Sequence, residues 1–345
     1  MSRVLCAMSG GVDSSVAAAR LLSAGHDVVG VTLKLWGGES DTGCCSVSDV
    51  DDARRVANQL GIEHHVFAFG EEFRDHVVEP YVAAHAEGRT PNPCIECNRH
   101  VKFDRLLRRA DALGFDAVAT GHHARIVSRA DGSRRVARGC DREKDQSYVL
   151  HMLGQAQLAR TLFPVGEGTK ADVRAEARAL GLRTALKPDS QDVCFITSAS
   201  GRSGFLSNRL AFTPAVVVDG AGLAVGALDA LELVTIGQRR GLGLAGGSGA
   251  PSFVTDVDRA RRVVTVGPAP DLLAPRVHLA ELEWADGAVA GDVSAQCSAH
   301  AAPLPARFDP ATGVLSWSEP QRRVAPGQSV VLYEGDQVLG GGVAV

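Results

Sequence analysis

The sequence predicts an α/β fold in which a parallel-sheet domain is followed by two small β domains. In the first 120 residues, short runs rich in β-branched residues alternate with segments of helical periodicity, the pattern of a parallel sheet covered by helices. After about residue 200 the helical periodicity fades, and valine-rich runs such as "PAVVVD" and "RRVVTVGP" stand among glycines and prolines. Such runs are typical of small antiparallel β domains or barrels.

The individual elements follow from the same patterns, and a chain of 345 residues is too long for one hydrophobic core. The expected strands of the first domain are residues 3–8, 28–35, 64–69 and 115–121. The expected helices are residues 16–23, 49–60, 71–86 and 103–113. Residues 124–138, with "RADGS" at the centre, predict a β-hairpin inserted after the sheet. We place the domains at residues 1–203, 204–267 and 268–345, the last of them a β-barrel.

The composition is that of a soluble globular protein, with 45% hydrophobic residues, 22% charged residues and a net charge of −4. No run approaches the ~20 apolar residues that span a bilayer, and the first apolar run is too short for a signal peptide. We therefore expect a cytoplasmic protein. Between Arg99 and Lys144, twelve Lys or Arg stand against six Asp or Glu, which suits a polyanionic partner or a solvated face.

The eight cysteines are expected as thiols in that compartment, where cysteine pairs are more often catalytic or metal-binding than structural. The stretch "GRTPNPCIECNRHVKFD" holds Cys94 and Cys97 with the spacing of either kind of site. Together with Cys44 and Cys45 they could supply four sulfurs to zinc, although adjacent cysteines suit a tetrahedral site poorly. We expect no special role for Cys6, Cys140 and Cys297.

The stretch "SGGVDSS", from Ser9 to Ser15, lies between the first expected strand and the first expected helix. Its glycines let the backbone turn tightly, and the following helix presents unpaired N–H groups and a positive dipole end to an anion. Asp13 could orient the loop or help to hold Mg²⁺. The stretch is neither a Walker A loop, because no Gly-Lys-Ser/Thr follows, nor a dinucleotide-binding G-x-G-x-x-G. It predicts a different phosphate-binding loop.

This loop resembles the pyrophosphate loop of the ATP pyrophosphatase (PP-loop) superfamily, whose members cleave ATP between its α and β phosphates and adenylate an acceptor oxygen. Further segments occur in the order "GRTPNPCIECNRHVKFD", "ATGHHAR", "REKDQSYVLH", "PDSQDVCFI" and "TIGQRRGLGL". With the loop, they make essentially the whole chain resemble the bacterial tRNA-specific 2-thiouridylases. The resemblance implies an adenine-nucleotide-binding first domain. It also implies an enzyme that uses ATP, Mg²⁺ and a persulfide to replace the 2-oxygen of the wobble uridine with sulfur.

The resemblance also implies roles for individual residues. Cys194 matches the family's persulfide-bearing cysteine and Cys97 its nucleophile, which implies a transient Cys97–Cys194 disulfide on turnover. The implied ATP contacts are Ala7, Met8, Ser9, Gly10, Gly11, Val12, Asp13, Ser14, Leu33 and Gly121. The implied tRNA contacts are His122, Lys144, Asp145, Gln146, Ser298, Ala299 and Gln328. The implied partners are the anticodon arm of tRNA and a persulfide donor such as a cysteine desulfurase or a sulfur relay protein. We expect a monomer, no membrane contact and no metal site built from protein residues.

Some alternatives stay open at this point. Cys94 stands where some family members have Asp, which leaves its part in proton transfer open. Ser298 and Ala299 stand where relatives have an Arg-containing strand, which leaves the C-terminal contribution to tRNA binding open. An AMP-forming ligase or amidotransferase on a small molecule would share the loop without needing both cysteines. A zinc-stabilised nucleic-acid-binding module without catalysis is the third possibility.

Overall fold

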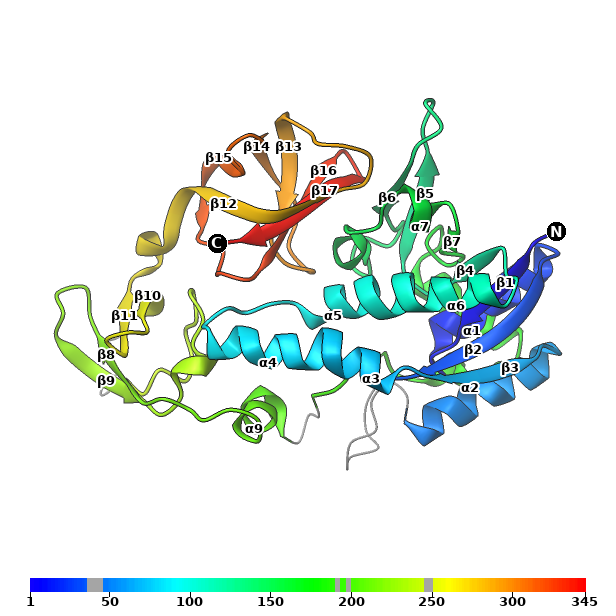
Figure 1. The fold of residues 1–345 in the computed structure, drawn as a ribbon, viewed down its shortest axis with the longest axis horizontal. Coiled ribbons are helices and arrows are strands. Elements are labelled where there is room, and N and C mark those ends of the chain that lie inside the picture. The colour runs from blue at the N-terminus through cyan, green and yellow to red at the C-terminus, as the bar shows by residue number, and fades with distance from the viewer. Residues whose placement is uncertain (36–45, 190–192, 197–199, 245–250) are drawn as a thin grey trace.

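The computed structural model describes residues 1–35, 46–189, 193–196, 200–244 and 251–345. Its N-terminal part is built on a five-stranded parallel sheet with the order β3-β2-β1-β4-β7 (Figure 1). The strands are β1 (Arg3–Ala7), β2 (Asp27–Lys34), β3 (His64–Ala68), β4 (Ala117–Ala119) and β7 (Thr161–Leu162). The four strands expected from the sequence are confirmed. The strand order reverses between β1 and β4, where ligand crevices open in sheets of this kind.

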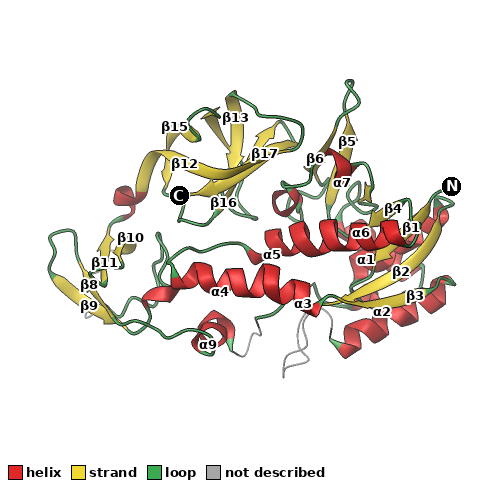
Figure 2. Cartoon of the chain, viewed as in Figure 1, coloured by secondary structure: helices red, strands yellow, loops and turns green. Residues whose placement is uncertain are grey.

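Helices cover both faces of this sheet (Figure 2). On one face α1 (Val12–Ser23), α2 (Val47–Leu60) and α8 (Lys170–Ala179) share one apolar cluster. On the other face α6 (Leu106–Ala112) belongs to a second cluster, which also includes Tyr81 of α4 (Glu79–Ala86), a helix that lies beside the sheet (Figure 1). The other helical segments are α3 (Gly70–Phe73), η1 (Arg74–Val78), α5 (Pro93–Glu96), η2 (Cys97–Arg105), η3 (Ser147–Leu150), α7 (Gln155–Leu158), η4 (Arg183–Leu186), α9 (Gly201–Ser207), η5 (Leu231–Leu233) and η6 (Ala269–Leu272). Within the described ranges, no helix is long and apolar enough to cross a membrane.

Two helices begin earlier than the sequence patterns predicted. α1 begins at Val12 instead of residue 16, directly after the glycine loop. The helix expected over residues 103–113 begins at Pro93, because α5, η2 and α6 follow one another without a break. The Asn92 side chain accepts a hydrogen bond from Cys94 N at 3.0 Å, and Pro93 suits a first helical position. These capping residues begin the helix where apolar periodicity is absent, so Cys94 lies in its first turn and Cys97 in its second.

The C-terminal strands close into a barrel. Its strands are β12 (Leu273–Trp284), β13 (Gly291–Gln296), β14 (Leu304–Asp309), β15 (Val314–Arg322), β16 (Ser329–Glu334) and β17 (Gln337–Ala344). β12 pairs with both β15 and β17, which closes the ring. The expected hairpin is confirmed as β5 (Ala124–Ser128) and β6 (Arg134–Arg138). Although it belongs to the N-terminal part of the chain, it joins the barrel sheet through the pair Gln337–Ala137.

The central strands form a separate four-stranded sheet with the order β10-β11-β8-β9. They are β8 (Ala215–Val218), β9 (Ala224–Leu228), β10 (Phe253–Asp258) and β11 (Val263–Gly267). The central β domain is confirmed, but its sheet is mixed, since β11 runs parallel to β8. The arrangement consists of two hairpins, β8–β9 and β10–β11, that pair through β8 and β11. The distribution of valine, glycine and proline in the sequence does not indicate which strands of two hairpins pair.

The barrel and the α/β domain share one core. Val331, Tyr333 and Val338 of the barrel belong to the same apolar cluster as Leu150 of η3. The Tyr148 hydroxyl, which is buried, donates to the carbonyl of Ser329 at 2.8 Å. The barrel therefore packs directly on the segment that follows the "KDQ" sequence at residues 144–146.

Candidate active site

The predicted phosphate loop lies at the switch point of the sheet, between β1 and α1. Gly10 has a φ of 72°, and a Cβ at this residue would meet the carbonyl oxygen of Asp49, in α2, at 2.3 Å. A Cβ on Gly121, just after β4, would meet the backbone nitrogen of Ser14 at 2.6 Å. The loop and the start of α1 are therefore wedged between α2 and the end of β4, and this packing requires glycine at both positions.

Serine hydroxyls tie the loop to the first turn of α1. Ser14 Oγ accepts a hydrogen bond from Ser9 N at 3.2 Å and donates to the carbonyl of Gly11 at 3.2 Å. Behind the loop, the Thr32 hydroxyl donates to the carbonyl of Met8 at 2.7 Å, and Leu33 is buried next to it on β2. The first N–H groups of a helix have no intrahelical acceptor, so this arrangement is suited to bind phosphate at the start of α1.

Asp13 is the centre of a charged network at this loop. Its Oδ1 accepts a hydrogen bond from His123 Nε2 at 3.0 Å, and its Oδ2 accepts one from Lys170 Nζ at 2.6 Å. Lys170, at the start of α8, also lies 3.0 Å from Asp189 Oδ1, and its side chain is only 12% exposed. One lysine thus bridges two carboxylates beside the candidate phosphate site.

The "KDQ" segment connects to the same network by two routes. Lys144 Nζ donates to Asp189 Oδ2 at 2.9 Å, and Asp189 in turn contacts Lys170. Gln146 Oε1 accepts a hydrogen bond from His123 N at 2.9 Å, and the His123 ring contacts Asp13. The segment expected at the target base and the loop expected at ATP are therefore parts of one hydrogen-bonded unit.

Both carboxylates of the network are ionised. Burial opposes ionisation of Asp13, but hydrogen bonds from His123 and Lys170 outweigh it, and the pKa of Asp13 falls below its ordinary value. Burial also opposes ionisation of Asp189, but hydrogen bonds from Lys144 and Lys170 hold its pKa well below the ordinary range. The hydrogen bond to Asp189 raises the pKa of Lys144, so this lysine keeps its positive charge beside the network.

Two residues that the family resemblance assigns to tRNA are buried. His122 packs with its ring centroid 5.9 Å from that of Phe103, and its Nδ1 lies 2.6 Å from the Thr120 hydroxyl. Burial lowers the pKa of His122 well below its usual value, so the ring is neutral. The Asp145 side chain is 5% exposed and accepts a hydrogen bond from the Ser147 hydroxyl at 2.8 Å. In this structure both side chains shape the segment around the crevice, and their contact with tRNA stays a prediction.

The two cysteines with predicted catalytic roles share one apolar cluster. Cys97 begins η2 and is 7% exposed, and Cys194 lies at the edge of the same cluster. The ring of Phe195, the next residue, packs edge-on against Phe73 at a centroid distance of 5.7 Å and against Tyr81 at 5.5 Å. The fold thus brings two segments almost 100 residues apart onto one core, and their disulfide on turnover stays a prediction.

Three further cysteines, Cys6, Cys140 and Cys297, have raised pKa values. Burial raises the pKa of Cys6 to about 12 and that of Cys297 to about 12, so neither forms the reactive thiolate. Partial burial and the neighbouring Glu167 raise the pKa of Cys140. Among the residues with described positions, no group of three or more His, Cys, Asp or Glu side chains could hold a metal ion. Cys44 and Cys45, the other half of the zinc alternative, lie outside the described residues.

The barrel forms hydrogen bonds with the loop that precedes the helix of Cys94 and Cys97. Gln328 Nε2 donates to the carbonyl of Thr90 at 2.7 Å, and Thr90 N donates to the carbonyl of Pro326 at 2.9 Å. Ser298 is exposed, whereas Ala299 packs against the apolar core, and the Gln296 side chain donates to the carbonyls of both residues. Gln328 therefore positions the approach to Cys94 and Cys97, and any contact of these barrel residues with tRNA stays a prediction.

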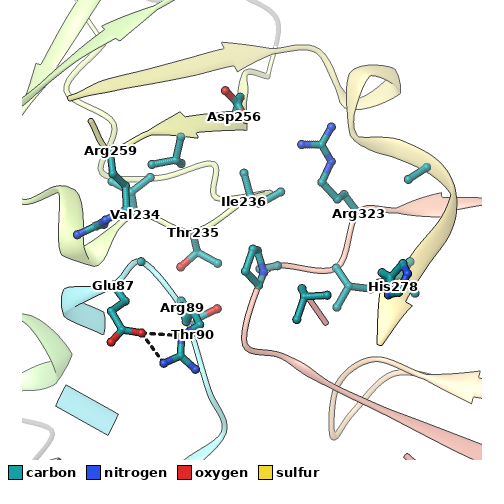
Figure 3. A pocket seen from close by; sticks show the side chains of 18 of the residues that line it. Glu87, Arg89, Thr90, Val234, Thr235, Ile236, Asp256, Arg259, His278 and Arg323 are labelled. Atoms are coloured by element: carbon teal, nitrogen blue, oxygen red, sulfur yellow. Dashed lines mark hydrogen bonds and ion pairs between the residues drawn. The ribbon is translucent and has the colours of Figure 1, made fainter. Parts of the chain in front are cut away.

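Next to these hydrogen bonds lies a cavity of about 470 Å³, at the junction of the α/β domain, the central sheet and the barrel. Arg89, Arg259 and Arg323 lie around it, one from each part of the fold (Figure 3). Its lining includes Gly88, Arg89 and Thr90, at the start of the stretch that leads to Cys94 and Cys97, but no residue of the phosphate loop or the "KDQ" segment. The cavity therefore adjoins the approach to the cysteine helix and is separate from the phosphate loop.

Three members of the charged network were not singled out from the sequence, namely His123, Lys170 and Asp189. His123 lies within "ATGHHAR" and Asp189 within "PDSQDVCFI", so both motifs were noticed while these residues were not. Lys170 lies in a segment with an ordinary helical pattern, and its role depends on a contact with a residue 157 positions away. Lys170 lies at the start of α8, where a positive charge is unfavourable with the helix dipole. This unfavourable position was the one feature of the sequence that pointed to a special role for Lys170.

Comparisons with known proteins identify the family. Residues 2–198 match the family described as the tRNA methyl transferase HUP domain, residues 203–268 the PRC-barrel domain and residues 277–344 the aminomethyltransferase β-barrel domain. The chain is 47% identical over 353 residues to a tRNA-specific 2-thiouridylase of Chloroflexus aurantiacus, covering 99% of this chain and 98% of that protein. It is 48% identical over 357 residues to the one of Sorangium cellulosum, covering 99% and 91%.

Part of the fold is also similar to a solved 4-thiouridine synthetase in complex with RNA and ATP. That likeness has a TM-score of 0.39 at 18% identity and covers 59% of this chain and 47% of that chain. The near-complete coverage by the curated relatives, together with the loop, the "KDQ" segment and the two cysteine segments, assigns the family. The chain belongs to the family of tRNA-specific 2-thiouridylases.

Proposed function

We propose that this protein is a tRNA-uridine 2-sulfurtransferase that uses ATP to thiolate the wobble uridine. The observation that carries the proposal is the network centred on Asp13. It joins the phosphate loop through Lys170 and His123 to Asp189, Lys144 and Gln146. Such a unit holds a nucleotide and the segment expected at the target base in fixed relation, as transfer between ATP and that base requires.

The first chemical step is adenylation of the uridine. Its O2 attacks the α-phosphorus of ATP, the α–β phosphoanhydride bond breaks, and pyrophosphate leaves. In this proposal the N–H groups at the start of α1 and the ammonium of Lys170 stabilise the negative charge of the leaving pyrophosphate, which their contacts around Asp13 support. The product carries AMP on the base oxygen, which makes this oxygen a good leaving group.

The second step transfers sulfur. The terminal sulfur of a Cys194 persulfide attacks the activated carbon, and AMP leaves with the former O2. The Cys97 thiolate then attacks the Cys194 sulfur, which breaks the S–S bond to the transferred sulfur and forms a Cys97–Cys194 disulfide. The two electrons that reduce the transferred sulfur come from the two cysteines, so an external thiol must reduce the disulfide before the next cycle. Placement of both cysteine segments on one apolar cluster supports this pairing.

Mg²⁺ is the implied metal. Mg²⁺ in nucleotide sites is commonly held by one or two carboxylates together with phosphate oxygens and waters. Asp13 and Asp189 are ionised carboxylates beside the phosphate loop and fit that donor set. Mg²⁺ bound there with ATP would supply charge neutralisation at the phosphates, and Asp13 and Asp189 would hold it.

The test is thiolation of an unmodified tRNA with a wobble uridine, using ATP, Mg²⁺ and a sulfide or persulfide source, with nucleosides analysed by mass spectrometry. A gain of sulfur for oxygen on that uridine, with one AMP and one pyrophosphate for each, supports the proposal. AMP formation without any change in the tRNA refutes it and favours a small-molecule ligase.

The cysteine roles have their own test with persulfide as the sulfur source. We expect Cys97→Ser and Cys194→Ser each to abolish thiolation while the Kd for ATP changes less than about twofold, since the family resemblance assigns neither residue to ATP binding. Cys140→Ser is the matched control, because Cys140 is exposed and no step proposed above uses it. Thiolation at the normal rate by either active-site variant contradicts the two-cysteine mechanism.

A further inference from the structure

A groove of about 370 Å³ lies between β3, at the edge of the parallel sheet, and helix α6. Val66, Phe67 and Phe69 form an apolar wall on the β3 side. Arg105, Arg108 and Arg109 form a basic wall on the helix side. None of the steps proposed above uses this groove, and none of its lining residues belongs to the network around Asp13.

The sheet edge in this groove offers backbone hydrogen bonds to an added strand. β3 is the last strand in the sheet order, so its outer edge pairs with no described strand. The carbonyl of Glu63 and the N–H of Phe69 bond to β2. Because alternate residues of a strand face opposite neighbours, Val66 and Ala68 direct their backbone groups outward. Val66 is 41% exposed although it is β-branched and apolar, which is typical of an edge that accepts a partner strand.

The charge of the groove selects an acidic partner. No acidic side chain is among the described residues that line it. Arg105 and Arg108 pair with acids at its rim, Glu72 at 2.8 Å and Asp104 at 2.7 Å. Arg109 has no acidic partner in the described part of the chain, and its guanidinium lies 5.4 Å from the Phe67 ring centre. The apolar wall and the sheet edge match an extended peptide better than an RNA backbone, which cannot add to a sheet.

The groove lies next to the segment of Cys194. The carbonyl of Phe69 accepts a hydrogen bond from Phe73 N at 2.9 Å, and the Phe73 ring packs against Phe195, the residue after Cys194. The "KDQ" segment and the barrel instead follow β4, on the opposite side of the sheet order from β3 (Figure 1). A partner in the groove therefore lies beside the Cys194 segment. The family resemblance implies that Arg105, Arg108 and Arg109 lie near the anticodon arm, so the test has to separate a protein partner from RNA.

We propose that this groove docks an acidic, extended segment of the protein that supplies persulfide sulfur. The proposal rests on the proposed function. In the transfer the Cys194 thiolate attacks the terminal sulfur of a donor cysteine persulfide. The donor S–S bond breaks, the donor cysteine leaves as a thiolate that takes up a proton, and Cys194 gains the persulfide. The exchange conserves sulfur and electrons and needs no oxidant.

The test compares two sulfur sources. Inorganic sulfide, as HS⁻, attacks the adenylated carbon directly with AMP as the leaving group and needs no donor protein, whereas a cysteine desulfurase charged with L-cysteine delivers persulfide sulfur to Cys194. The variant is Arg108→Glu with Arg109→Glu, and the matched control is Arg178→Glu on α8, across the sheet. We expect the double variant to thiolate tRNA with sulfide within about twofold of the wild type. We expect its kcat/KM for the charged desulfurase to fall by about tenfold or more, because charge reversal opposes an acidic partner. The control should change neither rate.

A second variant tests strand addition. Val66→Pro removes one outward N–H from the edge of β3, where proline is tolerated, and should also lower only the desulfurase-driven rate. Unchanged desulfurase-driven rates in both variants overturn the docking proposal. An equal fall of both rates with a raised KM for tRNA also overturns it and assigns the groove to RNA. Failure of the wild type to thiolate tRNA with either sulfur source refutes the proposed function itself, a result distinct from either of these.

Discussion

Replacement of Gly121 by alanine is the sharpest test of the phosphate loop. The new Cβ would lie 2.6 Å from the backbone nitrogen of Ser14 and 2.8 Å from the carbonyl carbon of Asp13. Ordinary contact begins near 3.4 Å, so the start of α1 must move by about 0.8 Å. The obstacles are backbone atoms, so no side-chain rotation relieves them. Overpacking of this kind costs about 1–3 kcal/mol of folding free energy.

The same shift weakens ATP binding. A hydrogen bond from a helix N–H to phosphate that lengthens by this amount is lost, and a hydrogen bond to a charged group contributes about 1.5–3 kcal/mol. We therefore expect the Kd for ATP to rise about 10- to 100-fold, measured by titration calorimetry, with stability measured by urea unfolding. Gly220→Ala is the control, because Gly220 has no positive φ and a Cβ added there would have no atom within 4 Å. Wild-type affinity in Gly121→Ala would refute the wedged geometry of the loop.

Two further predictions concern the charged network and the core. Lys144→Ala should raise the KM for tRNA several-fold but leave the Kd for ATP within about twofold, because Lys170 and Arg174 still hold Asp189. A Kd for ATP that rises together with the KM for tRNA would contradict this separation of the two binding roles. His151 is buried, and burial lowers its pKa to about 4. Below pH ~6.5 the unfolded state takes up a proton at this histidine and the folded state does not. The free energy of unfolding is therefore unaffected above pH ~6.5 and falls as the pH drops towards 4, by about 2 kcal/mol at pH 5. Urea unfolding of His151→Gln should show a smaller loss between pH 7 and pH 5, and an equal loss in both proteins would refute the assignment to this histidine.

The sequence determined the local features of this protein. The four strands of the parallel sheet follow from short runs of β-branched residues, and the phosphate loop follows from two glycines between a strand and a helix. Both patterns lie within a few consecutive residues, so they can be recognised without any knowledge of tertiary contacts. The β5–β6 hairpin was equally visible, because its turn chemistry is local.

Only the tertiary structure decided how distant segments combine. The bridge from Asp13 through Lys170 to Asp189 joins residues up to 176 positions apart, and the loop, α8 and the segment before Cys194 each look ordinary in isolation. The hairpin joins a barrel formed by the last part of the chain, and Gln328 ties that barrel to the loop before Cys94. Such contacts depend on complementary surfaces of folded elements, a property of the packed chain that no short stretch of sequence contains.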